Sequence, residues 1–171
     1  MGRFRRHPDI LFTMTESEPR KEAVPTLEYK QATPADAAAF VELERAVATS
    51  KTYSGVLSVE EALQEFTENE TYLIYQNGKL VGSTQFEMKG PDHAYLSGLV
   101  IHPDFQGRGI AREAALFRLN KLRDVKRIDV VTHPENAKIL HLYKSLGFTV
   151  EKRIENYYGD GEPRLLLVKQ Q

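Results

Sequence analysis

The first third of the chain contains one segment with strand periodicity followed by one with helix periodicity. Leu27–Gln31 alternates apolar and polar side chains, which predicts a short strand. Thr33 has the character of a helix N-cap, and Phe40, Leu43 and Val47 follow it at spacings of three and four residues. We therefore expect a strand and then an amphipathic helix.

The middle of the chain predicts a second helix and then strands joined by tight turns. Ser58–Glu61 has the capping-box pattern and opens a helix that runs through Phe66. Asn77 and Gly78 form a strong hairpin-turn signal, and Gly82 marks a candidate bulge in the strand that follows. The segments with strand character are Thr71–Tyr75, Lys79–Met88 and Ala94–Ile101.

The remaining elements complete an order of β-α-α-β-β-β-α-β-α-β-β. They are a helix with apolar positions at Ala111, Ala115, Leu119 and Leu122, a buried strand over Arg127–Val131, a helix with Ile139, Leu142, Tyr143 and Leu146 on one face, and a hairpin of Phe148–Tyr157 with Arg164–Val168. Hairpins dominate the first half, and one strand–helix–strand unit lies in the centre. This order predicts a mixed α/β (α+β) fold, a largely antiparallel mixed sheet with helices on both faces.

Composition places these elements in one globular domain over residues 26–171, after a polar leader over residues 1–25 that we expect to be flexible. The net charge of −1 gives no electrostatic case for a nucleic-acid or membrane partner. The chain has no cysteine, which excludes disulfides, thiolate metal sites and a cysteine nucleophile. We expect a cytoplasmic protein without a metal, and a homodimer is its candidate assembly.

The stretch from Leu99 to Arg112 carries the clearest candidate chemistry. It predicts a strand ending at Ile101, a turn, and a helix entered through Gly107 and Gly109. The first N–H groups of a helix have no intrahelical acceptor, and the helix dipole adds positive charge there. Glycines remove the Cβ atoms that would keep a ligand away from these donors. The pattern indicates an anion cradle, which suits the pyrophosphate of a nucleotide-tailed cofactor.

Two other interpretations of the glycines are open on the residues alone. They could form an ordinary tight turn. They could also begin a dinucleotide-binding G-x-G-x-x-G unit, for which Asp129 lies at a suitable distance, but Arg112 occupies the third glycine position. A Walker loop is excluded, because the chain contains no Gly-Lys-Ser or Gly-Lys-Thr.

Gln106-Gly-Arg-Gly-Ile-Ala111 resembles the Q/R-x-x-G-x-G/A signature of the GNAT superfamily of acetyl-CoA-dependent N-acetyltransferases. Leu99-x-Ile101-x-Pro103 precedes it, and Asn136-Ala-x-x-Leu-x-x-Tyr143-x-x-x-Gly-Phe148 is similar to the second motif of that family. The resemblance extends over residues 27–169. It implies a GNAT-like fold, acetyl-CoA as the cofactor, and an enzyme that transfers the acetyl group to a primary amine by direct attack on the thioester.

The resemblance also implies the site residues. Tyr143 corresponds to a tyrosine that protonates the departing thiolate, although its place on an apolar helix face equally suits a core residue. Asn136 contacts the cofactor arm or caps its helix. A backbone N–H near Val100 or Ile101 faces the thioester carbonyl, and Gly98 suggests a disturbed strand beside it. The implied cofactor-binding residues are Leu99, Val100, Ile101, Gln106, Gly107, Arg108, Gly109, Ile110, Ala111, Arg112 and Asn136.

The general base stays open, because the position at which related protein N-terminal acetyltransferases place Glu or His is Val131 here. The candidates are Tyr95, Ser97, Asp129, His133, Glu135 and a chain of waters. The tyrosine pair Tyr157-Tyr158 is similar to the final hairpin of ribosomal-protein alanine acetyltransferases, which favours a protein N-terminus as acceptor.

Two alternatives to that acceptor remain. A small amine such as a polyamine, an amino acid or an aminoglycoside is one, and the acids at Glu60, Glu61, Glu65 and Glu68 would attract a polyamine. The other is a CoA-binding sensor without turnover.

Overall fold

The computed structural model describes residues 26–48 and 55–171, so the expected leader over residues 1–25 falls outside the described residues. The strands are β1 (Leu27–Gln31), β2 (Glu70–Gln76), β3 (Lys79–Gly90), β4 (His93–Leu96), β5 (Leu99–Ile101), β6 (Arg127–Thr132), β7 (Thr149–Ile154) and β8 (Arg164–Gln170). The helices are α1 (Ala37–Val47), α2 (Val59–Glu68), α3 (Ile110–Lys121) and α4 (Ala137–Ser145), with short 3-10 turns η1 (Pro34–Asp36) and η2 (Pro103–Phe105).

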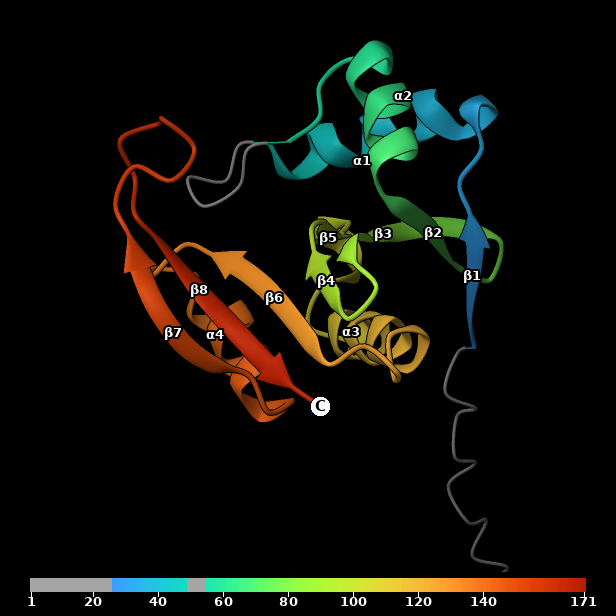
Figure 1. The fold of residues 1–171 in the computed structure, drawn as a ribbon. Helices are drawn as coiled ribbons and strands as arrows, with labels where there is room; N and C mark the ends of the chain where they lie inside the picture. The colour runs from blue at the N-terminus through green and yellow to red at the C-terminus, as the bar shows by residue number, and fades with distance from the viewer. Residues whose placement is uncertain (1–25, 49–54) are drawn as a thin grey trace, which may run out of the picture.

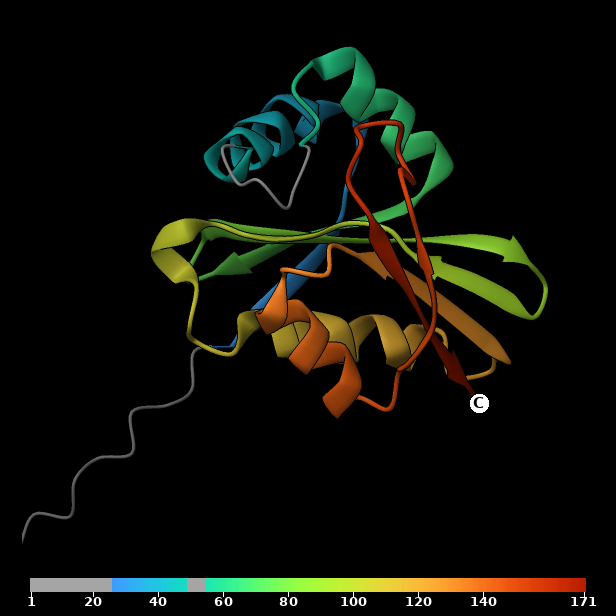
Figure 2. The same cartoon turned by 90° about the vertical axis from the view of Figure 1, so that its left-hand side faces the viewer.

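The strands form one sheet in the order β1-β2-β3-β4-β6-β8-β7, with β5 paired to β3. All neighbouring strands are antiparallel except β4 and β6, which are parallel. Helices α1 and α2 cover one face, while α3 and α4 cover the other (Figures 1 and 2). The predicted mixed sheet with helices on both faces is confirmed.

The structure divides the predicted strand over Ala94–Ile101 into β4 and β5 at Ser97-Gly98, which confirms the disturbance expected at Gly98 and corrects the single strand to two. Both parts pair with β3, so the chain direction is kept across the break. Gly98 marks the place of the break in the sequence, but it does not show that the two parts separate into distinct strands, because apolar residues continue on both sides. The bulge expected near Gly82 is confirmed, since the β2–β3 register shifts between Ile74 and Tyr75, opposite Gly82 and Leu80.

The final hairpin has a longer connection than its sequence predicts. Strand β7 ends at Ile154 rather than at Tyr157, and β8 continues to Gln170. Asn156 ends the strand because it adopts a left-handed φ of 49°, and its Oδ1 accepts the Gly161 N–H at 2.7 Å. Tyr157 and its neighbour therefore lie in a loop and not in a strand.

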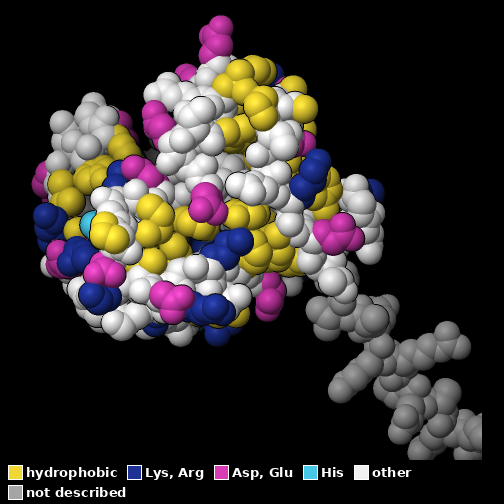
Figure 3. All heavy atoms as spheres, turned by 45° about the vertical axis from the view of Figure 1, so that its right-hand side comes forward, with side chains coloured by type: hydrophobic (Ala, Val, Ile, Leu, Met, Phe, Trp, Pro, Cys, Tyr) yellow, Lys and Arg dark blue, Asp and Glu magenta, His cyan; other side chains and the backbone are white. Residues whose placement is uncertain are grey.

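The core lies on both sides of the sheet. Phe40 and Val41 of α1 pack with Leu73 of β2 on one side of the sheet, whereas Leu96 and Ile128 are buried on the side of α3 and α4. On the face drawn in Figure 3, acidic and basic side chains are interspersed. Across residues 26–48 and 55–171, no helix has the length and apolar character needed to cross a membrane.

Gly82 is required by close approach of two strands. A Cβ at this position would lie 2.6 Å from the carbonyl oxygen of Val100 and 2.8 Å from Cδ1 of Ile101. We expect Gly82→Ala to lower the free energy of unfolding by about 2 kcal/mol, because overpacking forces the backbone to move. Urea denaturation measures the loss. Gly90→Ala in the same strand is the matched control, since a Cβ there meets nothing within 4 Å, and equal stability of the two variants would contradict the explanation.

Candidate active site

The sheet opens where the chain passes from β4 to β5. Strand β4 pairs with β6 as far as Leu96 and Val130, but β5 pairs only with β3. The Gln85 N–H donates to the Gly98 carbonyl at 2.8 Å, and the His102 N–H donates to the Val81 carbonyl at 2.8 Å. One edge of β5 is thus bound to β3, and its other edge faces the opening.

Alternation of backbone groups along β5 decides which of them reach the opening. Because Gly98 and His102 bond to β3, the backbone of Val100 also points to β3, and that of Leu99 and Ile101 points away from it. The Ile101 carbonyl accepts the Gln106 Nε2 at 3.0 Å. The N–H groups of Leu99 and Ile101 are therefore the donors on this edge, which an extended ligand could use.

The glycine loop continues from the end of β5. Gly107 and Gly109 have φ of 74° and 81°, a region that favours glycine, and α3 begins at Ile110. No side chain caps this helix start, so its first N–H groups remain available. Arg108 donates to the Asp104 carbonyl at 2.9 Å and lies over the Phe105 ring. The loop is held by its own side chains while its amides face outward from the helix end.

A cavity of about 490 Å³ lies against this loop. It is lined by Val47, Leu99, Val100, Ile101, Phe105, Gln106, Gly107, Gly109, Ile110, Ala111, Arg112, Asn136, Lys138, Ile139 and Leu142. The cavity thus gathers the predicted cofactor-binding residues except Arg108, which turns back onto Phe105. Their binding role stays a prediction. Asn136 Oδ1 accepts the Ile139 N–H at 3.4 Å, so Asn136 caps α4 and lines the cavity as well.

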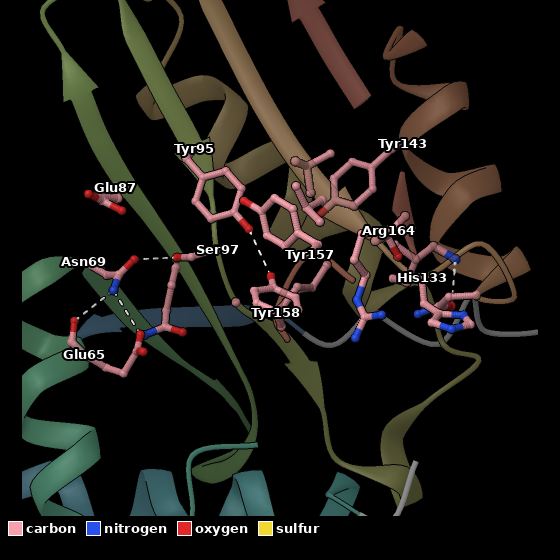
Figure 4. A pocket seen from close by; sticks show the side chains of 18 of the residues that line it. Glu65, Asn69, Glu87, Tyr95, Ser97, His133, Tyr143, Tyr157, Tyr158 and Arg164 are labelled. Carbon is pink, nitrogen blue, oxygen red and sulfur yellow. Dashed lines mark hydrogen bonds between the residues drawn. The ribbon is translucent and has the colours of Figure 1, made fainter. Parts of the chain in front are cut away.

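A second cavity of about 400 Å³ adjoins the first, and both are lined by Leu99, Asn136 and Ile139. Figure 4 shows Glu65, Asn69 and Ser97 on one side of it and Tyr143, His133 and Arg164 on the other. A group attached to a ligand in the first cavity can therefore meet a molecule in the second at these three shared residues. We call the first the glycine-loop cavity and the second the acceptor cavity.

Tyr143 projects from α4 and lines the acceptor cavity, although it is only 3% exposed. Its ring packs against Phe148, and its hydroxyl oxygen accepts a hydrogen bond of 2.6 Å from Nη2 of Arg118. Both interpretations from the sequence thus describe it, because the ring belongs to the core while the hydroxyl lies at the cavity. Its catalytic role stays a prediction.

Glutamates form one wall of the acceptor cavity. Among the described residues that line it are Glu65, Glu68 and Glu87. Glu65 accepts hydrogen bonds from Asn69 Nδ2 at 3.0 Å and from Gln85 Nε2 at 3.5 Å, but no lysine or arginine of the described chain forms an ion pair with it. Burial, and then the neighbouring charge of Glu68, raise the pKa of the Glu65 carboxyl above its ordinary value.

The loop between β7 and β8 supplies the opposite wall. Tyr157 and Tyr158 pack edge to face, with ring centroids 4.7 Å apart, and both line the cavity. Arg164 lies over the Tyr158 ring and donates to Asp160 at 2.6 Å, so its charge is already paired. The Tyr95 and Tyr158 hydroxyls are 3.4 Å apart. The cavity therefore combines aromatic surface with two carboxylates, Glu65 and Glu68, that form no ion pair with a basic residue of the described chain, whereas Glu87 pairs with Lys89 at 2.6 Å.

The candidate bases on β4, on β6 and in the break between β4 and β5 differ in their surroundings. Burial and the adjacent Tyr158 raise the pKa of Tyr95 far above its ordinary range, so this phenol keeps its proton. Ser97 donates to Asn69 at 2.6 Å and lines the cavity. Asp129 lies outside the cavity lining and is engaged by His93 and Arg127, each at 2.8 Å.

His133 and Glu135 serve the start of α4 in the structure. The Nδ1 of His133 accepts the Glu135 N–H at 3.1 Å, which leaves the proton on Nε2, 3.0 Å from Glu162. Both ring nitrogens are thus occupied, while Glu135 is exposed and lies outside the cavity lining. Val131 lines the cavity but cannot accept a proton.

The sequence interpretation missed Arg118 and the hydrogen bonds that hold Glu65. Arg118 has a signal in the sequence, since it follows Ala115 and precedes Leu122 at spacings of three and four on the apolar face of α3. The partners of Glu65, by contrast, come from the end of α2 and from β3. Only the folded arrangement brings them together.

Residues 39–148 match the family described as "Acetyltransferase (GNAT) family". The crystal structure of the ribosomal-protein-S18-alanine N-acetyltransferase from Escherichia coli superposes with a TM-score of 0.72 at 22% identity, over 85% of this chain and 94% of that one. At this identity the likeness concerns the fold.

Two curated relatives differ in the acceptors that their names state. N-alpha-acetyltransferase 30 of Dictyostelium discoideum is 31% identical over 103 residues, which cover 56% of each chain. Spermidine N(1)-acetyltransferase of Escherichia coli (strain K12) is 29% identical over 70 residues, 39% of this chain and 38% of that one. The chain thus spans about half or less of the length of these relatives.

Proposed function

The chain belongs to the acetyltransferase (GNAT) family, and we propose from that membership that it is an N-acetyltransferase that transfers the acetyl group of acetyl-CoA to a primary amine. The observation that carries this proposal is the meeting of the two cavities at Leu99, Asn136 and Ile139. This junction lies beside the free edge of β5 and is lined on the acceptor side by Tyr143. Binding in separate cavities that meet at one point holds two reactants in the geometry for direct transfer.

The residues of the glycine-loop cavity fit a molecule with a pyrophosphate group. Positions 107 and 109 have open space where a Cβ would lie, and the uncapped amides of α3 supply donors with a favourable dipole. Arg112 and Lys138 add positive charge to the lining. Acetyl-CoA supplies the acetyl thioester when bound. The N–H of Leu99 or that of Ile101 would stabilise negative charge on the carbonyl oxygen, and Tyr143 would hold the proton for the sulfur.

The acceptor that this site suits best is a small amine carrying more than one positive charge, such as a polyamine. Glu65 and Glu68 line the cavity without a basic partner among the described residues. Such a wall attracts the ammonium form of the acceptor, and it favours a second cation on the same molecule. The similarity to a spermidine acetyltransferase supports this choice.

A protein N-terminus is the second candidate acceptor. The exposed Tyr157 and Tyr158 form an aromatic wall beside the cavity, which suits an extended peptide as well as a small amine. The similarity to N-alpha-acetyltransferase 30 also favours a peptide. The two candidate acceptors differ in the positive charge they carry. A polyamine has several ammonium groups, whereas a peptide without basic side chains has only its terminal ammonium.

Release of free CoA, measured with a thiol reagent, tests both the activity and the acceptor. We expect acetyl-CoA with spermidine or spermine to give the highest kcat/KM, and peptides with neutral side chains to give less. Faster turnover of such peptides would overturn the polyamine assignment and support a protein N-terminus. Acetyl-CoA binding by calorimetry without CoA release on any amine or peptide would overturn the enzyme and support a sensor.

Glu65→Gln is expected to raise KM for spermidine about ten-fold with little change in kcat, because a hydrogen bond to a charged group contributes about 1.5 kcal/mol. Glu60→Gln is the matched control, since Glu60 lies on the same helix but is exposed and outside the cavity lining. Steady-state kinetics at constant ionic strength make the comparison. An equal change in both variants would mean that the cavity wall does not bind the acceptor.

The raised pKa of Glu65 also predicts an effect on stability. Between the ordinary pKa and the raised one, the folded protein binds more protons than the unfolded chain, so stability falls as the pH rises through this window. Glu65→Gln has no proton to lose at this position, so this fall in stability with rising pH is absent from the variant. We expect the variant to be more stable than the parent protein at neutral pH and equal to it at about pH 3.5, below the ordinary carboxyl pKa. Urea denaturation at both pH values checks this, and a neutral-pH loss of stability would contradict it.

A further inference from the structure

Arg118 is a completely buried cation in the last turn of α3, with an exposed fraction of 0%. Nη1 donates to the carbonyl oxygens of Gln85 at 3.0 Å and Gly98 at 3.1 Å, and Nη2 donates to the Tyr143 hydroxyl at 2.6 Å. Within the described residues no carboxylate forms an ion pair with it. A buried charge without a counter-ion lowers stability relative to an apolar side chain of similar volume. Its presence therefore calls for a role other than packing.

The bond to Tyr143 determines where the phenolic proton lies. A guanidinium has donors and no acceptor, so the Tyr143 oxygen is the acceptor of the 2.6 Å bond. The hydroxyl proton then points elsewhere, and in the described part of the chain no protein group accepts it. Because Tyr143 lines the acceptor cavity, this proton is available to a group bound there. Negative charge that forms on the oxygen when the proton leaves is stabilised by the same guanidinium.

The other arm of Arg118 holds the strand break. Gly98 lies in the break between β4 and β5, and Gln85 faces it from β3. By binding both carbonyls, Nη1 fixes the position at which β5 begins and thus the direction of the Leu99 N–H. One side chain therefore connects the candidate proton donor with the backbone edge that faces the opening of the sheet.

We propose that Arg118 is a positioning residue for acetyl transfer, which orients Tyr143 as proton donor and stabilises the charge that this tyrosine acquires. The inference rests on the proposed acetyltransferase activity. It differs from a structural role for Arg118 in one measurable respect: the larger part of its effect on turnover must pass through the Tyr143 hydroxyl, and only the smaller part through the Gly98 carbonyl.

A double-mutant cycle tests the proposal. We expect Arg118→Met to lower kcat about 50-fold in the parent protein and about three-fold in the Tyr143→Phe background, because the hydroxyl is then absent and only the contact with the Gly98 carbonyl is left to lose. Arg118→Lys keeps a buried donor and is expected to recover at least a third of the parent kcat. The melting temperature and the KM for acetyl-CoA serve as controls for folding and for binding. An equal loss of kcat in both backgrounds would overturn the proposal.

Binding provides a readout that does not depend on turnover. Calorimetry with CoA and with desulfo-CoA measures how much the sulfur contributes to affinity. We expect the parent protein to bind CoA more tightly than desulfo-CoA. Tyr143→Phe and Arg118→Met should both show only a weak preference for CoA, whereas Arg118→Lys should keep nearly all of the parent preference. A parent-like preference in Arg118→Met would contradict the proposal even if no acceptor is turned over. Absence of CoA release by the parent protein on every amine would instead refute the proposed function.

Discussion

Tyr143→Phe is expected to lower kcat by about 10²- to 10³-fold while changing the Kd for acetyl-CoA less than two-fold. The phenolic proton is the group that the site offers to the departing sulfur, and a positioned acid contributes rate enhancement of about this size. Phenylalanine keeps the ring contact with Phe148, whose centroid lies 5.2 Å away. The core is therefore preserved while the proton donor is lost.

Tyr29→Phe is the matched control for this substitution. Tyr29 stacks on Phe117, its hydroxyl is buried without a hydrogen-bond partner, and it lines neither cavity. Tyr29→Phe removes a buried phenolic oxygen, as Tyr143→Phe does, but it changes neither cavity. We therefore expect kcat to stay unchanged. Single-turnover measurement of the acetylated product by rapid quench separates chemistry from product release. Unchanged kcat in Tyr143→Phe would remove this tyrosine from the mechanism.

The sequence predicts those parts of the fold whose causes are local. The capping box at Ser58 begins α2, the Asn77-Gly78 turn joins β2 to β3, and the two positive-φ glycines lie at the start of α3. In each case a few neighbouring residues determine the backbone conformation. These elements were therefore accessible without any knowledge of the tertiary structure.

The parts that the sequence does not predict depend on distant partners. Gly98 predicts a disturbed strand, but the contacts of the break with Gln85 and with the guanidinium of Arg118 join three segments that only the fold brings together. Nor does local pattern show that Tyr157 leaves its strand, because the loop closes on Asn156. The two walls of the acceptor cavity are of the same kind, since α2 and the β7–β8 loop, which are far apart in the sequence, face each other across that cavity.

Replacing both loop glycines, Gly107→Asn with Gly109→Asn, is expected to weaken CoA binding about 100-fold, which corresponds to about 2.7 kcal/mol. Asparagine tolerates positive φ better than other side chains, so the φ values of 74° and 81° can be kept. A Cβ at either position meets nothing of the protein within 4 Å. The added side chains therefore occupy the space through which a pyrophosphate would approach the amides.

Isothermal titration calorimetry with CoA and with S-acetylpantetheine locates this effect. Pantetheine lacks the pyrophosphate, so its weaker affinity should be the same in the variant and in the parent protein. Gly78→Asn is the control for backbone conformation, because Gly78 has a similar φ of 75° and open surroundings in the β2–β3 turn, far along the chain from the loop. We expect it to bind CoA normally. If the double variant is as stable as the control and still binds CoA with parent affinity, the pyrophosphate does not lie on these amides. The glycine-loop cavity is then not the cofactor site, and the acceptor cavity is not the acceptor site.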